Sequence, residues 1–248
     1  MILLFFIRTV AAQENPSTAE HLTDSAKVCR SKYVKWIVPA FGVIYGVAAR
    51  FDESPVRLLD RHVADRINKQ IDRRYTLDDW LQYVPAAAAY GLDFVPSMDS
   101  QNNLRDRTLL FAVSYAVMGL TIVSLKNSTQ IRRPDGTANN SFPSGHTATA
   151  FAGAHLLYKE YKNHSLWIGV GGYVAATATG VMRVINKRHW VSDAVTGAAI
   201  GVLSVEAAYL LLPVGQRLLN IDKKDSRISI LPTANIENSM GVCIVYRF

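Results

Sequence analysis

Ser141-Phe-Pro-Ser-Gly-His-Thr147 stands directly before an apolar run and is one of three polar clusters that decide how this chain is organised. The first cluster is Lys126-Asn-Ser-Thr-Gln-Ile-Arg-Arg-Pro134, and the third is Arg183-Val-Ile-Asn-Lys-Arg-His-Trp-Val-Ser-Asp193. Together the clusters contain fixed cations, two histidines, a carboxylate and a Ser-Gly turn at the start of a predicted helix. Phosphoryl transfer needs a nucleophile, an acid and groups that bind anions, so the clusters predict chemistry on a phosphate group.

The composition favours a membrane protein over a nucleic-acid-binding protein. The 248 residues carry a net charge of +7, and 49% of them are hydrophobic. The length fits one large domain or two small ones. Basic loops between apolar segments are typical of membrane proteins, and no nucleic-acid motif is present, so we expect no nucleic-acid partner. Cys29 and Cys243 lie far apart in the sequence and are predicted to be unpaired thiols.

Six apolar blocks contain or flank the clusters. Several fall short of the roughly 20 residues that a helix needs to cross a hydrocarbon core, but few charges interrupt the last four. Gly and Ala are frequent in them, which allows helices to approach closely in a membrane. We predict an all-α, membrane-embedded bundle of about six helices, with a soluble all-α bundle as the alternative. The blocks are 33–49, 80–96, 108–125, 147–158, 166–182 and 192–212.

The two ends of the chain differ from its middle. Residues 1–32 comprise a signal-like segment and a polar stretch; small residues suit cleavage before Gln13, and an uncleaved segment is the alternative. Residues 33–212 form the predicted helical domain. The tail, 213–248, contains two β-prone runs separated by turn-forming residues, which predicts a short C-terminal β-hairpin or an irregular tail.

The charged region between the first two blocks, Arg50 to Asp79, has a partial helical stripe of apolar residues. We interpret it as a basic amphipathic helix on an anionic membrane face, where it helps to position an anionic headgroup. A solvated connector helix is the alternative. Its arginines are Arg57, Arg61, Arg66, Arg73 and Arg74.

The second cluster has a functional and a structural interpretation. Ser144 and the amides near Gly145 are predicted at a helix N-terminus, where free N–H groups and the helix dipole favour an anion. Taken alone, the same residues fit an ordinary N-cap and turn, and His146 fits a capping or packing histidine.

In the third cluster, His189 and Asp193 are four residues apart, so in a helix they share one face. Alternatively, Asp193 caps the last helix and its carboxylate reaches back to His189. In either case the carboxylate can fix the imidazole tautomer and stabilise its positive charge. The structural alternative for His189 and Asp193 is an ordinary His–Asp pair on the surface. For Arg183, Lys187 and Arg188 it is a set of basic residues at the membrane interface.

The order Lys-x6-Arg-Pro, Pro-Ser-Gly-His and Arg-x5-His-x3-Asp resembles the type 2 phosphatidic-acid phosphatase superfamily over about 100–212, and the apolar blocks resemble its membrane branch. Met182 stands where the family usually has Ser. Four shorter runs resemble more particularly the bacterial, Bacteroidetes-type lipid A 4′-phosphatases. These runs are 90–94, 105–107, 167–173 and 183–190.

The resemblance implies a role for each matched residue. His189 attacks phosphorus and forms a phosphohistidine, Asp193 orients it, and His146 protonates the leaving oxygen and later activates water. It also implies no metal and no other cofactor, because the cations neutralise the phosphoryl group. The phosphate-binding residues that it implies are Lys126, Arg133, Ser144, Gly145 and Arg183.

The implied function is that of a membrane lipid phosphatase that hydrolyses a phosphomonoester of lipid A, with the 4′-phosphate favoured. Undecaprenyl pyrophosphate or phosphatidylglycerol phosphate is the alternative substrate. A vanadate-dependent haloperoxidase and a non-enzymatic lipid-binding membrane protein are alternatives of other classes. We expect a multi-pass protein of the bacterial inner membrane with a periplasmic active site and no obligate protein partner; cleavage of the N-terminal segment with six spans would instead place the site in the cytoplasm.

Overall fold

The computed structural model describes residues 34–71, 75–95, 97–218, 228–234 and 240–246. By its internal contacts the chain divides into residues 1–37 and 38–248, and the fold discussed below is that of the second unit. The predicted signal-like segment and Cys29 lie outside the described residues, so their predictions stay predictions.

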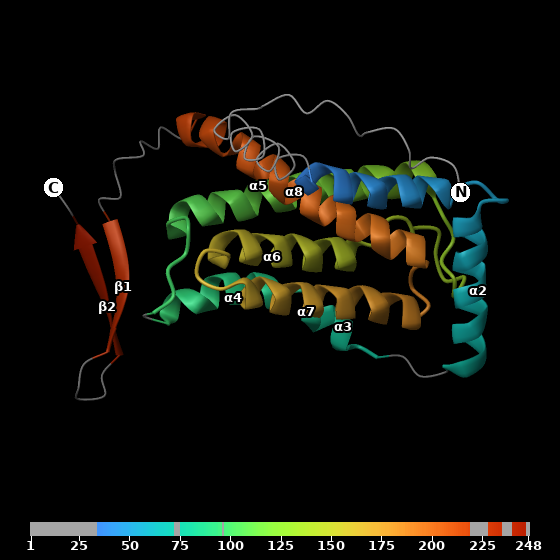
Figure 1. The fold of residues 1–248 in the computed structure, drawn as a ribbon, viewed down its shortest axis with the longest axis horizontal. Helices are drawn as coiled ribbons and strands as arrows, with labels where there is room; N and C mark the ends of the chain where they lie inside the picture. The colour runs from blue at the N-terminus through green and yellow to red at the C-terminus, as the bar shows by residue number, and fades with distance from the viewer. Residues whose placement is uncertain (1–33, 72–74, 96, 219–227, 235–239, 247–248) are drawn as a thin grey trace, which may run out of the picture. The chain divides into compact units, whose positions relative to one another are not determined.

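The described chain is built from helices, apart from a terminal hairpin, which confirms the predicted all-α bundle (Figure 1). A first helix, Val34–Ala48, corresponds to the first apolar block. The other helices are α2 (Pro55–Gln70), α3 (Leu77–Leu81), α4 (Val84–Gly91), the 3-10 turn η1 (Leu92–Phe94), α5 (Leu104–Thr129), α6 (Gly145–Tyr161), α7 (Leu166–Ile185) and α8 (Val191–Leu218).

Helix α6 lies at the centre of the bundle, where it packs against α4, α7 and α8 (Figure 1). Its contact faces are made of small residues. A Cβ atom on Gly201 of α8 would lie 2.4 Å from the carbonyl oxygen of Ala148, and one on Gly153 would lie 2.9 Å from the backbone nitrogen of Ala86. The abundance of Gly and Ala in the apolar blocks therefore serves close helix packing, as predicted.

Within the part of the chain that the structure describes, three helices are long and apolar enough to cross a membrane, namely α5, α7 and α8. Successive helices from α5 to α8 run in alternating directions (Figure 1). The C-terminal ends of α5 and α7 and the N-terminal ends of α6 and α8 therefore meet at one end of the bundle, and these ends carry the three polar clusters. The chain is a multi-pass membrane protein whose polar clusters share one end.

Some predicted boundaries are wrong. The block 80–96 is divided among α3, α4 and η1, because Pro85 occupies the first turn of α4 and begins a new helix there. It is therefore too short to be a span of its own. Helix α5 begins before the third block, which was placed at 108–125, and Asn103 Oδ1 accepts a hydrogen bond of 2.8 Å from the backbone N–H of Asp106 at its start.

A second set of buried polar contacts lies at the other end of the bundle. Arg107 is buried and donates from Nη1 to Asp93 at 2.9 Å, and its Nη2 also pairs with that carboxylate. Tyr161 donates to the same carboxylate at 2.9 Å. These contacts join η1, α5 and α6, so Arg107 has a structural role there.

Helix α2 begins at an N-cap formed by Ser54, whose hydroxyl accepts a 3.1 Å hydrogen bond from the N–H of Arg57, with Pro55 in the first turn. It contacts α8 (Figure 1). Asp60 is its one buried residue, and the rest of the helix is half-buried or exposed. The helix predicted in the charged region is confirmed, and its membrane-surface role stays a prediction.

The C-terminal tail forms the predicted hairpin. Strands β1 (Ile228–Ala234) and β2 (Met240–Tyr246) pair antiparallel, with Ile228 opposite Tyr246 and Leu231 opposite Cys243.

Candidate active site

Hydrogen bonds between backbone and side chains join the three polar clusters. The N–H of Ser144 donates to the carbonyl of Asp193 at 3.0 Å, and the ring of His189 contacts the carbonyl of Ser141 at 2.7 Å. Nζ of Lys126 donates to the carbonyl of Asn140 at 2.5 Å. Residues 14 to 49 apart in the sequence thus surround one place at the end of the bundle.

The loop between α5 and α6 owes its shape to residues with unusual backbone angles. Gln130 ends α5 with a φ of 46°, and Gly136 turns the loop with a φ of 71°. The N–H of Arg133 donates to the carbonyl of Ala138 at 2.9 Å. The loop contains no helix or strand, but this turn fixes the backbone that carries the Arg133 side chain.

The N-terminus of α6 approaches α8 closely. A Cβ atom on Gly197 would lie 2.4 Å from the carbonyl oxygen of Ser144, so this contact requires glycine. Ser144 is fully buried, and its hydroxyl lies 2.9 Å from that of Thr147. The N–H of Ser144 is already bonded to Asp193, and its side chain makes no capping bond, so the first helical amides, of Gly145 and His146, are the donors left for an anion.

His189 is 2% exposed, and its orientation is set by a backbone carbonyl. Nδ1 donates to the carbonyl oxygen of Ser141 at 2.7 Å, which leaves the lone pair of the neutral ring on Nε2. Nδ1 is 3.9 Å from Oδ2 of Asp193, which is beyond hydrogen-bond distance. The nearest acceptor of the ring is thus the Ser141 carbonyl, and the orientation of His189 by Asp193 stays a prediction.

Asp193 acts instead on the backbone around His189. Its Oδ2 atom accepts hydrogen bonds from the hydroxyl of Ser141 at 2.5 Å and from the N–H of Trp190 at 3.0 Å. The carboxylate thus holds the residue whose carbonyl binds the imidazole. It is fully buried and adds negative charge beside the ring.

Burial lowers the pKa of His189; Asp193 opposes this shift, while the positive charges of Arg183 and Lys126 add to it. The ring is therefore held in its neutral form. A neutral imidazole with its lone pair on Nε2 is the form that can attack phosphorus.

The guanidinium groups of Arg133 and Arg183 each have a donor without a partner. Within the described residues, the Nε atoms of both side chains are buried and make no hydrogen bond. Burial lowers the pKa of Arg133, and the nearby charges of Arg188 and Arg183 lower it further. An unsatisfied buried donor is costly, so two of them on neighbouring cations indicate a place for an anion with several acceptor oxygens.

Arg183 is held by residues that the sequence analysis did not select. Its Nη1 donates to Asp78 at 2.7 Å, and Asn186 Nδ2 donates to the other oxygen of Asp78 at 3.0 Å. Asn186 also exchanges hydrogen bonds of 2.9 Å and 2.7 Å with the backbone of Tyr75. In the sequence, Asp78 belongs to the charged region 50–79 and Asn186 lies between the motif residues Arg183 and His189. Neither has a distinctive local pattern, so only the contact between α3 and the end of α7 identifies them.

A second unpredicted group connects α2 to α8. The buried Asp60 accepts from the N–H of Ser192 at 3.0 Å and from its hydroxyl at 2.5 Å. Arg50 donates to the hydroxyl of Ser192 at 3.0 Å and lies 3.5 Å from Oδ1 of Asp193. Asp60 thus caps the helix that carries Asp193.

Met182, which replaces the usual Ser of the family pattern, is half-buried on α7, and its carbonyl accepts from the N–H of Asn186 at 2.8 Å. Among the residues that the structure describes, no group of three or more His, Cys, Asp or Glu side chains is arranged to hold a metal ion.

Residues 107–216 match the PAP2 superfamily. The match confirms the family predicted for this segment, and it spans α5 to α8 with all three clusters.

Two curated proteins are similar to part of the chain. A lipid A 1-phosphatase of Porphyromonas gingivalis is 51% identical over 98 residues, which are 40% of this chain and 22% of that protein. The bacitracin transport permease protein BcrC of Bacillus licheniformis is 32% identical over 105 residues, which are 40% of this chain and 48% of that protein. The matched part is thus less than half the length of either relative. The first is named a 1-phosphatase, so the predicted 4′ group is not the one matched.

Two solved structures are similar in fold. LpxE of Aquifex aeolicus has a TM-score of 0.44 and 21% identity, covering 60% of this chain and 93% of that one. The first transmembrane PAP2-type phosphatidylglycerolphosphate phosphatase from Bacillus subtilis has a TM-score of 0.46 and 20% identity, covering 77% and 99%.

Proposed function

We propose that this chain is a metal-independent membrane phosphatase that removes a phosphomonoester from lipid A through a phosphohistidine. The observation that carries the proposal is the pair of buried Nε donors of Arg133 and Arg183, which have no partner within the described residues. The charges of these two arginines act on each other, and that of Arg183 also acts on the buried ring of His189. Tetrahedral phosphate has the several oxygens that such donors require. The PAP2 match of residues 107–216 supports the same chemistry.

The reaction has two steps. In the first, Nε2 of His189 forms a bond to phosphorus while the bond to the leaving oxygen breaks, and His146 gives that oxygen a proton. In the second, water attacks the phosphohistidine, His146 accepts the proton of the water, and phosphate leaves. Lys126, Arg133 and Arg183 stabilise the charge of the phosphoryl oxygens in both steps, and the amide of Gly145 adds a hydrogen bond.

The position of the scissile phosphate on lipid A is the finer part of the proposal. The relative from Porphyromonas gingivalis favours the 1-phosphate, whereas the short runs at 90–94, 105–107, 167–173 and 183–190 were interpreted as favouring the 4′-phosphate. We take the 1-phosphate as the proposed target, because that similarity is an aligned match of 51% over 98 residues.

Mass spectrometry of lipid A tests the proposal. Cells that make bis-phosphorylated lipid A are given this chain or its His189→Gln variant, and each lipid is fragmented to locate the phosphate that remains. We expect loss of the 1-phosphate with the wild-type chain alone. Loss of the 4′-phosphate would overturn the position; unchanged lipid A with turnover of undecaprenyl pyrophosphate or phosphatidylglycerol phosphate would overturn the substrate.

We further propose that the protein lies in the bacterial inner membrane with the polar-cluster end of the bundle at the periplasmic face. A lipid substrate of the outer leaflet would reach that end directly. Cysteines introduced singly at the exposed Asp52 and Thr137 should react with a membrane-impermeant thiol reagent in intact cells, and labelling only after lysis would contradict the orientation.

A further inference from the structure

Asp79 of α3 lies beside two groups of the candidate active site. Its Oδ1 atom is 3.0 Å from Nε2 of His146 and 3.5 Å from Nη1 of Arg183. The side chain of Asp79 is 55% exposed and that of His146 is 33% exposed, so solvent reaches this part of the site. The carboxylate of Asp79 thus contacts His146, which is the acid of the proposed mechanism.

The neighbouring carboxylate fixes Asp79 in place. Asp78 is buried and bonded to both Arg183 and Asn186, which anchors α3 to the end of α7. The N–H of Asp79 donates to the carbonyl of Thr76 at 3.1 Å. Asp78 is therefore the anchor of α3, and Asp79 is the residue that this anchor presents to His146.

We propose that Asp79 is a positioning residue for His146, and this inference rests on the proposed phosphatase function. The carboxylate accepts Nε2–H of the charged ring, so Nδ1–H is the proton that faces the leaving oxygen. As the bond between phosphorus and that oxygen breaks, its electron pair stays on oxygen and takes the Nδ1 proton. His146 becomes neutral, and Asp79 remains a carboxylate that does not touch the substrate.

The charges around His146 explain why such a partner is needed. Burial lowers the pKa of His146 and the positive charge of Arg183 lowers it further, whereas the hydrogen bond and charge of Asp79 and the charge of Asp78 raise it. An acid must be protonated in order to donate, so activity falls as the pH rises through this pKa. Loss of the charge of Asp79 lowers the pKa, and activity is then lost at a lower pH.

The test is kcat/KM as a function of pH for Asp79→Asn with two substrates. One is a short-chain phosphatidic acid, whose alkoxide leaving group needs a proton; the other is p-nitrophenyl phosphate, whose phenolate does not. For the phosphatidic acid, kcat/KM falls at high pH, and we call this fall the alkaline limb of the pH profile. We expect this limb to move to lower pH by about half a unit or more in the variant. kcat/KM for this substrate should fall on the order of tenfold, while that for the aryl phosphate stays near the wild-type value.

Two further variants complete the experiment. Asp79→Glu keeps the charge and should restore the limb. Asp99→Asn removes the same charge from an exposed position near Gln101, whose N–H bonds to Glu160 at the opposite end of α6, and should leave the limb in place.

An unchanged limb in Asp79→Asn, or an equal loss with both substrates, would overturn the positioning role. Failure of the proposed phosphatase function is distinguishable, because the wild-type protein would then release phosphate from neither of these substrates nor from lipid A.

Discussion

The carbonyl oxygen of Ser141 lies 2.7 Å from Nδ1 of His189, closer than either oxygen of the Asp193 carboxylate that was expected to hold this ring. A backbone carbonyl can accept a hydrogen bond but cannot take a proton at ordinary pH. It therefore fixes the tautomer with Nε2 free, whatever the charge state of Asp193. The carboxylate is left with two tasks, which are to hold Ser141 and Trp190 and to stabilise positive charge on the ring.

This division of roles predicts different losses for two variants. His189→Gln should form no phosphoenzyme and should retain less than about a hundredth of wild-type kcat, because the covalent route is lost. Asp193→Asn should lower kcat about a hundredfold. This loss is smaller than the roughly 10⁴-fold loss in kcat that follows where an Asp→Asn change also allows the wrong tautomer of the catalytic histidine. The measurements are kcat and the amount of acid-trapped phosphoprotein.

Asp193→Asn should still form the phosphoprotein, since Nε2 keeps its lone pair. Circular dichroism and the Tm in detergent serve as the control, because the substitution disturbs a buried network. A folded Asp193→Asn variant without phosphoprotein would show that the carboxylate, and not Ser141, sets the state of His189.

The sequence predicted the helices better than the connections between them. Apolar blocks identified the helices because burial and membrane insertion act on every residue of a block. The motif residues were located because their spacing is specific. Asp60 and Asp79, by contrast, lie in a charged segment that has no distinctive local pattern, and their partners Ser192 and His146 are 132 and 67 residues away.

The contact between His189 and Ser141 was missed for another reason. The group that accepts the hydrogen bond is a backbone carbonyl, and every residue has one, so no residue type can signal it. The His-x3-Asp spacing pointed to the neighbouring carboxylate, which lies 3.9 Å from Nδ1, but it contained no sign of the carbonyl. Long-range backbone contacts of this kind depend on how α6 and α8 pack, which a local pattern does not contain.

Packing between α6 and α8 gives a prediction on stability. Gly201→Ala places a Cβ atom 2.4 Å from the carbonyl oxygen of Ala148 and 2.9 Å from the N–H nitrogen of Ala152, so a helix backbone must shift. We expect a loss of about 1–3 kcal/mol in the free energy of unfolding, as for other overpacked cores. Thermal unfolding in detergent measures it as a lower Tm.

Gly119→Ala is the matched control, since it makes the same chemical change inside α5. A Cβ atom at this position meets no atom within 4 Å. Its Tm should equal or exceed that of the wild type, because Ala favours a helix by up to about 1 kcal/mol over Gly. Equal losses in both variants would show that α6 and α8 do not approach as closely as the structure has them.

The proposed site also predicts that chelators leave the activity unchanged. Lys126, Arg133 and Arg183 supply the positive charge that magnesium supplies in many phosphoryl-transfer enzymes. Phosphate release should continue at the same rate after dialysis against excess EDTA, with a magnesium-dependent phosphatase treated in parallel as the control. Complete loss that added magnesium restores would contradict the proposed roles of these three cations.

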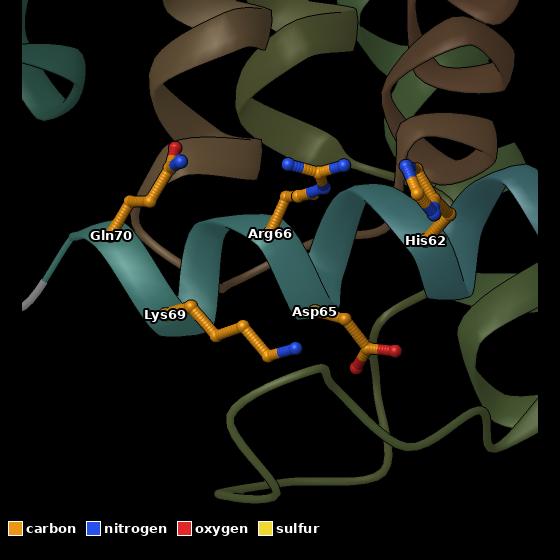
Figure 2. Close-up of a pocket in the computed structure, with 5 residues that line it drawn as sticks. All are labelled: His62, Asp65, Arg66, Lys69 and Gln70. Atoms are coloured by element: carbon orange, nitrogen blue, oxygen red, sulfur yellow. The ribbon is translucent and has the colours of Figure 1, made fainter.

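The basic surface of α2 contains different residues from those predicted from the sequence. Arg73 and Arg74 lie outside the described residues, Arg57 lies 4.9 Å from the ring of Trp190, and Arg61 pairs with Asp52 at 3.1 Å. The remaining basic residues line a hollow of about 330 Å³, and Figure 2 shows them along one exposed stretch of the helix. This hollow is lined by His62, Asp65, Arg66, Lys69 and Gln70.

We predict that Arg66 and Lys69 bind the anionic headgroup of the lipid substrate, at about 1 kcal/mol for each cation near the membrane surface. Neutralising both as glutamines should raise KM for lipid A by roughly tenfold or more and leave the hydrolysis of p-nitrophenyl phosphate unchanged. Arg105→Gln with Arg217→Gln is the matched control, because it removes two exposed cations at the other end of the bundle. Asp60 of α2 bonds to Ser192, three residues after His189, so α2 is joined to the site end of α8. If KM rises equally in the control, the effect is one of total charge at the membrane and α2 has no headgroup site.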